Sequence, residues 1–303
     1  MSMQQRNPVG WQDYTSAILN GFLGDWLEHR ANPLAIEMQV LHEGTPVNPA
    51  QPGPDQARQT IVIMVHGLTE LESIWDFPGL PGVHYGTLLS EFLGATPLSL
   101  RYNSGRPIHR NGEDLARTLE TLIEHWPVPV EKVVLIGHSM GGLLIRSACH
   151  FAEAAGHEWT ERVDSCVYLG CPHDGSWLAT LAHGTAGRMR KQTRDYLKVI
   201  GEVLDLRSAG IRNLSRGDIL QQEGEQPPLL ANARHFAISG LLARQKENPV
   251  NLMFGDALVQ ENSARGGEQK GWELAGYACF PGINHIGLTR HPRVYQQLRE
   301  WLE

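Results

Sequence analysis

The chain has 303 residues, of which 41% are hydrophobic and 19% charged, and its formal net charge is −7. A chain of this size and composition can bury a large apolar core, and α/β folds of this length often form one domain. The negative charge argues against a dedicated nucleic-acid binder, which needs basic surface to neutralise phosphates.

The sequence pattern shows neither an export signal near the start nor the uninterrupted apolar run of about 18 residues that an integral membrane segment needs. The four cysteines (Cys149, Cys166, Cys171 and Cys279) form no CxxC pair, and no histidine cluster stands beside them at zinc-ligand spacing. We therefore expect a cytoplasmic protein with reduced thiols and no metal. The oligomeric state cannot be inferred from the sequence.

In chain order, Trp11 to Leu27 comes first, and its apolar residues recur at helical spacing, which is typical of a helix packed on a core. Residues 44–59 are rich in Pro, Gly and Gln and are expected to form an exposed loop. From Thr60 on, short apolar runs recur, each suited to a strand buried on both faces. These runs are 60–65, 96–102, 132–137, 165–170, 235–239 and 277–280.

Amphipathic helical patterns separate several of these runs, for example at 112–126 and 142–155. Strands and helices in alternation predict an α/β fold with a mainly parallel sheet covered on both faces.

Residues 176–232 break the alternation, because they are strand-poor, helix-like and rich in charge. An insertion there would overhang the carboxyl ends of the strands, where open α/β sheets bind ligands. The expected organisation is an N-terminal helical segment and loop packed on the core (1–59), a core (60–175 and 233–303) and a cap or lid (176–232).

The strongest functional motif is Gly137-His138-Ser139-Met140-Gly141. It follows an apolar strand pattern and opens a helical one, which is the strand–turn–helix setting of a nucleophilic serine. Small residues are needed on either side of such a tight turn. We therefore predict that Ser139 is a nucleophile.

A serine nucleophile also needs donors for the oxyanion that forms during acyl transfer. One is the backbone N–H after the nucleophile, here Met140, and the second comes from the turn after an earlier strand. His66-Gly67-Leu68 follows the first apolar run, and the Leu68 N–H is the natural second donor. The His66 side chain is expected to hydrogen-bond the loop.

The general base should follow the acid late in the chain. His285 comes directly after the last strand pattern and is the first choice, whereas His291 precedes a proline at the expected start of the final helix. For the acid, Asp256 follows an apolar stretch and is favoured by its late position. Asp174 is the alternative, although its Pro and Gly neighbours also fit a plain turn.

Four segments together resemble the α/β-hydrolase superfamily, and within it the lipase and esterase branch that includes GPI inositol-deacylases and triacylglycerol lipases. They are His66-Gly67-Leu68, Gly137-His138-Ser139-Met140-Gly141-Gly142, Gly255-Asp256-Ala257-Leu258-Val259 and Asn284-His285. The resemblance implies the α/β-hydrolase fold, an acyl ester substrate, a triad of Ser139, Asp256 and His285, and no cofactor. The chain departs from the family pattern at Ala257, where a second glycine is usual, and at Cys171, where a threonine often opens the lid region.

These observations predict a serine hydrolase that cleaves the carboxylic esters of small molecules or lipids through an acyl-enzyme. Residues 186–216 interleave charges with a modest apolar stripe, which favours a soluble carboxylesterase over a lipase with a membrane-active lid. A thioesterase, amidase or acyltransferase could use the same triad. A non-catalytic binding module is disfavoured, because every catalytic requirement has a candidate residue.

Overall fold

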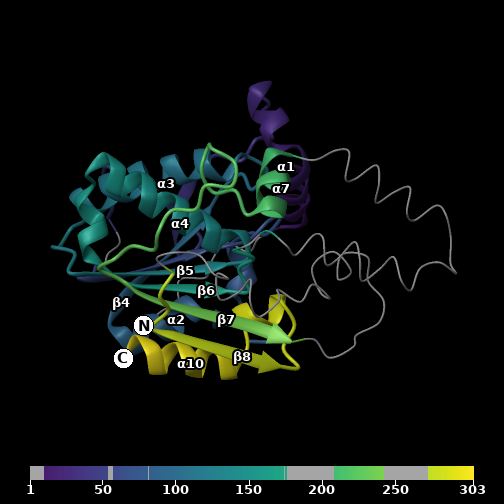
Figure 1. Cartoon of the computed structure of the whole chain (residues 1–303). Coiled ribbons are helices and arrows are strands. Elements are labelled where there is room, and N and C mark those ends of the chain that lie inside the picture. Colours follow the sequence, from purple (N-terminus) through teal and green to yellow (C-terminus); the bar gives the residue numbers. More distant parts are fainter. Residues whose placement is uncertain (1–9, 54–56, 81, 174, 176–207, 242–271) are drawn as a thin grey trace, which may run out of the picture.

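The computed structural model describes residues 10–53, 57–80, 82–173, 175, 208–241 and 272–303. These residues form a mainly parallel sheet between two helical layers (Figure 1). The elements in chain order are α1 (Trp11–His29), β1 (Gln39–His42), β2 (Thr45–Val47), β3 (Thr60–Val65), η1 (Glu72–Trp75), α2 (Tyr85–Leu93), β4 (Ala95–Arg101), α3 (Ile108–Glu124), β5 (Lys132–His138), α4 (Met140–Ala155), η2 (Glu158–Arg162), β6 (Val163–Leu169), α7 (Ala209–Arg216), β7 (Arg234–Leu241), β8 (Gly276–Pro281), η4 (Ile286–Thr289) and α10 (Pro292–Leu302).

The described sheet has eight strands in the order β2-β1-β4-β3-β5-β6-β7-β8. The six strands from β3 to β8 pair in parallel, and they coincide with the six apolar runs of the sequence to within a few residues. The antiparallel strands β1 and β2 at one edge were not predicted, and the expected loop at 44–59 is wrong over Thr45–Val47. The predicted α/β class with a mainly parallel sheet is confirmed.

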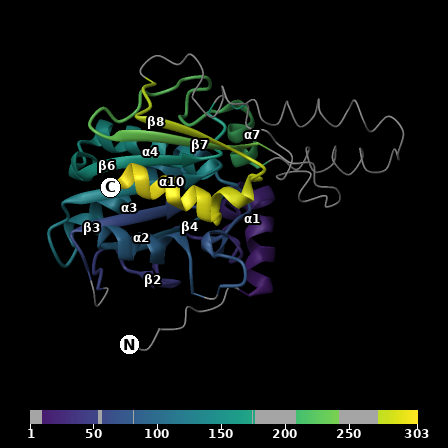
Figure 2. The same ribbon diagram turned by 90° about the horizontal axis from the view of Figure 1, so that it is seen from below.

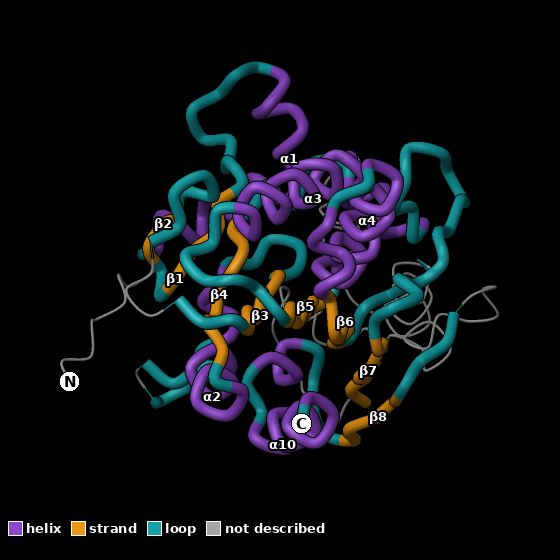
Figure 3. Tube along the Cα trace, turned by 90° about the vertical axis from the view of Figure 1, so that its left-hand side faces the viewer, coloured by secondary structure: helices purple, strands orange, loops and turns teal. Residues whose placement is uncertain are grey.

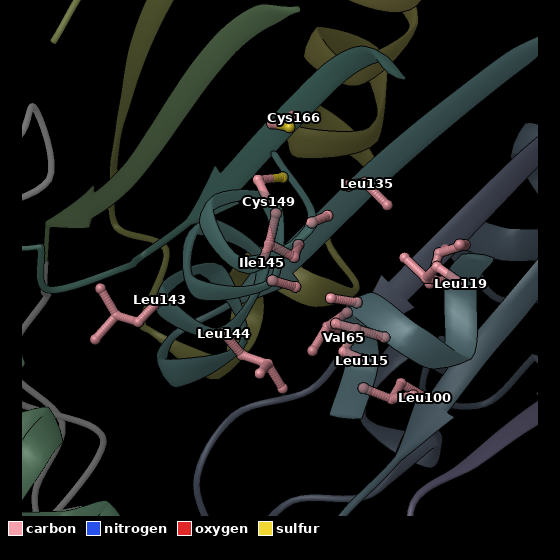
Figure 4. Packing of buried hydrophobic residues seen from close by; sticks show 14 of the residues in the cluster. Val65, Leu100, Leu115, Leu119, Leu135, Leu143, Leu144, Ile145, Cys149 and Cys166 are labelled. Carbon is pink, nitrogen blue, oxygen red and sulfur yellow. The ribbon is translucent and has the colours of Figure 1, made fainter. Parts of the chain in front are cut away.

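Helices cover both faces of the sheet, as the view along the strands shows (Figure 3). α3 and α4 lie on one face, and α2 and α10 lie on the other, where α10 runs along the direction of the strands (Figure 2). Each layer closes an apolar core of its own. In the larger core, Leu143 and Leu144 of α4 and Leu115 and Leu119 of α3 pack with sheet residues such as Leu135 (Figure 4). Each of these five side chains is at most 1% exposed, so this layer is fully closed.

α1 packs on the carboxyl-end loops through small residues, and only part of its apolar stripe, including Leu27 at 2% exposed, is buried. A Cβ added to Gly21 would lie 2.3 Å from Thr69 Cγ2, and one added to Gly24 would lie 1.8 Å from Asn103 Oδ1. Ile18 and Trp26 of the stripe are about half exposed, at 48% and 52%. The close approach of backbones requires glycine at the contact, and this requirement turns the larger side chains outward.

The register of the parallel strands aligns the loops that follow them. Val65 at the end of β3 pairs with Gly137, and His138 at the end of β5 pairs with Leu169 of β6. The turn after β3, the turn after β5 and the loop after β6 therefore emerge side by side at one edge of the sheet.

Most of the predicted cap, residues 176–207, lies outside the described residues. The rest of that stretch contains α7, whose Ile211 and Leu214 belong to the larger apolar core. α7 contacts α1 and α3.

Candidate active site

Ser139 occupies a strained turn between β5 and α4. Its backbone angles are φ 52° and ψ −122°, a region that costs a non-glycine residue about 1–3 kcal/mol. The positions two residues to either side must be glycine, since a Cβ on Gly137 would lie 2.5 Å from Gly142 N and one on Gly141 would lie 2.3 Å from Val65 O. The turn is held in place by the Ser139 N–H, which donates to Leu169 O at 2.9 Å. The serine side chain thus stands at the N-terminal, positive end of α4.

The turn after β3 lies against this serine. A Cβ added to Gly67 would be 2.9 Å from Ser139 Cβ. The Thr69 N–H donates to Ser104 Oγ at 3.0 Å, and the Gly67 N–H donates to Glu70 Oε2 at 2.7 Å. The Leu68 N–H between them donates to no acceptor among the described residues.

Met140 is the first residue of α4, so its N–H has no partner within the helix. The two N–H groups that the sequence selects as oxyanion donors thus belong to segments that meet at Ser139. This arrangement allows the two donors to act together on one oxygen atom.

His66 has the structural role that the sequence analysis favoured. Its Nδ1 lies 2.8 Å from Gly67 O, and its ring stacks on Tyr102 with centroids 4.5 Å apart. The Tyr102 hydroxyl donates to His66 O at 2.9 Å. Burial lowers the pKa of His66, so the ring is neutral and braces the turn.

His285 lies in the loop between β8 and η4. Its ring packs against Gly170, where an added Cβ would be 2.8 Å from His285 Nδ1. Burial, together with the charge of His138, lowers the pKa of His285 to about 3. The described surroundings therefore keep this imidazole neutral, as a general base must be before it takes a proton.

His291, the second choice for the base, caps α10 instead. Its Nδ1 accepts a hydrogen bond from Arg293 N at 3.1 Å. Both acid candidates, Asp256 and Asp174, lie outside the described residues, and their assignment stays a prediction.

Cys171, which departs from the family pattern, fills a tight position behind the nucleophile. Its thiol donates to Gly137 O at 3.5 Å, and a Cβ on Gly142 would lie 2.2 Å from its sulfur. Burial raises the pKa of this thiol, so it remains protonated and acts as a small donor.

The sequence analysis missed one charged group at this site, Glu70. Its Oε2 lies 2.8 Å from His138 Nδ1, and His138 Nε2 lies 3.1 Å from the backbone oxygen of His285. The rings of His138 and His285 lie 4.6 Å apart, centroid to centroid. Glu70 lies in a loop, and no motif in the surrounding sequence singles it out. Its contact with His138, the residue before Ser139, identifies it as part of the site.

The described residues contain no group of His, Cys, Asp and Glu side chains that could hold a metal ion. Nor does any helix in the described ranges have the length and hydropathy needed to cross a membrane.

A mainly parallel sheet with helices on both faces, and a strained serine at the turn from a central strand into a helix, is the arrangement of α/β hydrolases. The chain has this fold. Residues 104–207, which include the Ser139 turn, match the family model of the PGAP1-like alpha/beta domain. The match covers the segment around the Ser139 turn and agrees with the α/β-hydrolase fold of the chain.

Solved structures similar to the chain include three hydrolases. The RedJ thioesterase of the prodiginine pathway in Streptomyces coelicolor is 18% identical, with 85% of this chain and 97% of that chain covered and a TM-score of 0.48. A hormone-sensitive lipase from a metagenome library is 14% identical over 82% of this chain and 77% of that chain, with a TM-score of 0.48. Aspergillus fumigatus lipase B is 13% identical over 85% of this chain and 54% of that chain, with a TM-score of 0.49. None of the curated proteins compared with the chain is significantly similar to it.

Proposed function

We propose that the protein is a serine carboxylesterase that works through an acyl-enzyme at Ser139. The observation that carries the proposal is the strained backbone of Ser139, φ 52°, at the point where the Leu68 and Met140 segments meet. Strain of this kind is retained where the surrounding structure enforces it, and it is concentrated at active sites.

In the proposed mechanism, Ser139 Oγ attacks the ester carbonyl while His285 takes the hydroxyl proton. The Leu68 and Met140 N–H groups donate to the oxyanion, and collapse of the tetrahedral intermediate expels the alcohol with the proton held by His285. Water, activated by His285, then releases the carboxylic acid and regenerates Ser139. Asp256 is assigned the role of orienting the imidazole, with Asp174 as the alternative acid.

Each preorganised donor is worth a large factor, since loss of one oxyanion donor typically costs about 10²–10³ in kcat. Both donors here are backbone groups of turns fixed by glycine packing and hydrogen bonds, so their positions depend on the loops rather than on side-chain rotamers. This is the preorganisation that acyl transfer needs.

The test is hydrolysis of p-nitrophenyl esters from acetate to palmitate, combined with a fluorophosphonate label mapped by mass spectrometry. We expect the label on Ser139, and we expect Ser139→Ala to lose hydrolysis while retaining its thermal unfolding midpoint. Ser147→Ala is the matched control, because Ser147 lies on the same helix and its hydroxyl donates to Ile219 O, at 2.7 Å, away from the nucleophile. Hydrolysis by Ser139→Ala above background would refute the mechanism.

The same series defines the substrate class. A maximum at short chains indicates a carboxylesterase, whereas a sharp rise in rate when a long-chain ester exceeds its solubility indicates a lipase. For the acid, Asp256→Asn is expected to be more damaging than Asp174→Asn, and the reverse order would reassign the role to Asp174.

A further inference from the structure

Glu70 and His138 form a buried link between the three loops of the site. The His138 side chain is fully buried, and that of Glu70 is 14% exposed. Glu70 Oε2 accepts from the Gly67 N–H at 2.7 Å and lies 2.8 Å from His138 Nδ1, while His138 Nε2 lies 3.1 Å from His285 O. Because His138 directly precedes Ser139, one pair of side chains touches the oxyanion turn, the nucleophile turn and the loop of the base.

The hydrogen-bond partners determine where the protons are. His285 O is a carbonyl and can only accept, so His138 Nε2 must carry a proton. Burial raises the pKa of Glu70, but the charge and hydrogen bond of His138 outweigh it, and the pKa stays below its ordinary value. Glu70 is therefore a carboxylate, which also only accepts, so Nδ1 carries a proton as well.

We propose that this buried ion pair positions the oxyanion turn and the base loop on Ser139, a role that rests on the serine-esterase function proposed above. Glu70 holds the turn through the N–H of Gly67, adjacent to the Leu68 donor. His138 holds the base loop through the carbonyl of His285. Both are positioning residues, since neither reaches the substrate in this scheme.

Glu70 also reduces the effect of the His138 charge on the base, since the charge of His138 lowers the pKa of His285 and the charge of Glu70 raises it by a smaller amount. His138 lies 4.6 Å from His285, centroid to centroid, and an unpaired cation there would oppose the imidazolium that His285 becomes during catalysis. The Glu70 carboxylate partly offsets this charge. Among the described residues, the charge of Glu70 also acts on His66, which burial keeps neutral, and on Tyr102, whose pKa burial raises.

Glu70→Gln tests the role with a change of charge at nearly constant shape. With the carboxylate gone, His138 either stays charged and opposes protonation of His285, or becomes neutral and accepts at Nδ1 from the new amide N–H, which takes the acceptor away from the Gly67 N–H. Either change is expected to reduce kcat, and neither alters a group that contacts the substrate. Misplacement of a catalytic group by 1 Å can cost about 10²-fold, so we expect kcat to fall about 10–100-fold with KM changed less than about twofold.

A second buried ion pair provides the matched control. Glu72, 1% exposed, is hydrogen-bonded to Arg101, with Arg101 Nε 3.0 Å from Glu72 Oε2. Glu72→Gln makes the same chemical change two residues away, in a pair whose hydrogen bonds join Glu72 to Arg101 and not to Gly67 or His285. We expect both variants to have lower thermal unfolding midpoints, and only Glu70→Gln to lose kcat.

Nitrogen-15 NMR of the wild-type protein tests the pair without reference to activity. We expect both ring nitrogens of His138 to be protonated at pH 8, and a His138 ring with a single proton would overturn the ion pair even if a variant failed to fold. An active wild-type enzyme whose Glu70→Gln variant keeps its kcat would overturn the positioning role. A folded wild-type protein that hydrolyses no ester and takes up no fluorophosphonate would instead overturn the proposed function, and with it the catalytic use of the pair.

Discussion

Replacing Gly170 with alanine should push the imidazole of His285 and lower the rate of hydrolysis. The new Cβ would lie 2.8 Å from His285 Nδ1 and 3.1 Å from Leu288 Cδ1. Ordinary contacts begin at 3.4 Å, so the ring must move by roughly 0.6 Å. Because a 1 Å displacement of a catalytic group can cost 10²-fold, we expect kcat/KM to fall by about 10-fold.

Gly170→Ala should also reduce stability, because Gly170 has φ +62°. A left-handed conformation costs an alanine about 1–2 kcal/mol, and overpacking adds about 1–3 kcal/mol. The expected loss in the free energy of unfolding is therefore about 2–5 kcal/mol, measured by urea denaturation followed by tryptophan fluorescence.

Gly156→Ala is the control for Gly170→Ala. Gly156 ends α4 with φ +71°, and a Cβ there would meet nothing within 4 Å. This variant carries the same backbone strain without the collision, so it should lose about 1–2 kcal/mol of stability and keep its kcat/KM. If the two variants hydrolyse esters equally well, the position of His285 does not control the rate, and its assignment as the base is refuted.

Two further predictions concern stability. Burial lowers the pKa of His66 and, with the charges of Arg146 and His235, that of His173. The unfolded chain therefore binds more protons than the folded chain below about pH 6.5. The free energy of unfolding consequently decreases as the pH is lowered, by about 1.4 kcal/mol per pH unit for each histidine that stays neutral in the folded chain. Urea denaturation between pH 7.5 and 5.5 should show this loss and His173→Asn should reduce it; equal slopes would contradict the reasoning. Asn20→Ala should cost about 1–3 kcal/mol, because buried Asn20 binds Leu34 O at 2.7 Å and Ile36 N at 2.9 Å. Asn48→Ala, in an exposed turn, is the control. An Asn20→Ala variant with a thermal unfolding midpoint as high as that of Asn48→Ala would contradict this prediction.

The sequence predicted the parallel part of the sheet because fully buried strands leave a strong signal. The run TIVIMV at Thr60–Val65 is buried at five of its six positions, and all five buried residues are apolar. β1 and β2 lack this signal, since they are short, lie at an edge and include Pro46. Their pairing depends on a partner in β4, more than 50 residues further along the chain, and no local pattern records it.

The residues of the site were likewise only partly predictable from the sequence. The turn at Ser139 was predictable because its geometry demands glycines at fixed spacing, and the Leu68 turn because it follows a strand. Glu70 was not predictable, since its partner His138 is 68 residues away and a glutamate in a loop is ordinarily solvated. The face by which α1 packs was also missed, because contact through Gly21 is set by the approach of another backbone and not by hydrophobicity.

The contact between α1 and the turn after β3 bears on where the catalytic unit begins. The family match starts at residue 104, yet Gly21 of α1 packs on Thr69, next to the Leu68 donor. A shortened protein that kept every recognisable motif but started at Thr60 would keep the proposed nucleophile and lose the support behind Leu68, one of the two proposed oxyanion donors. We therefore expect the smallest active fragment to include α1.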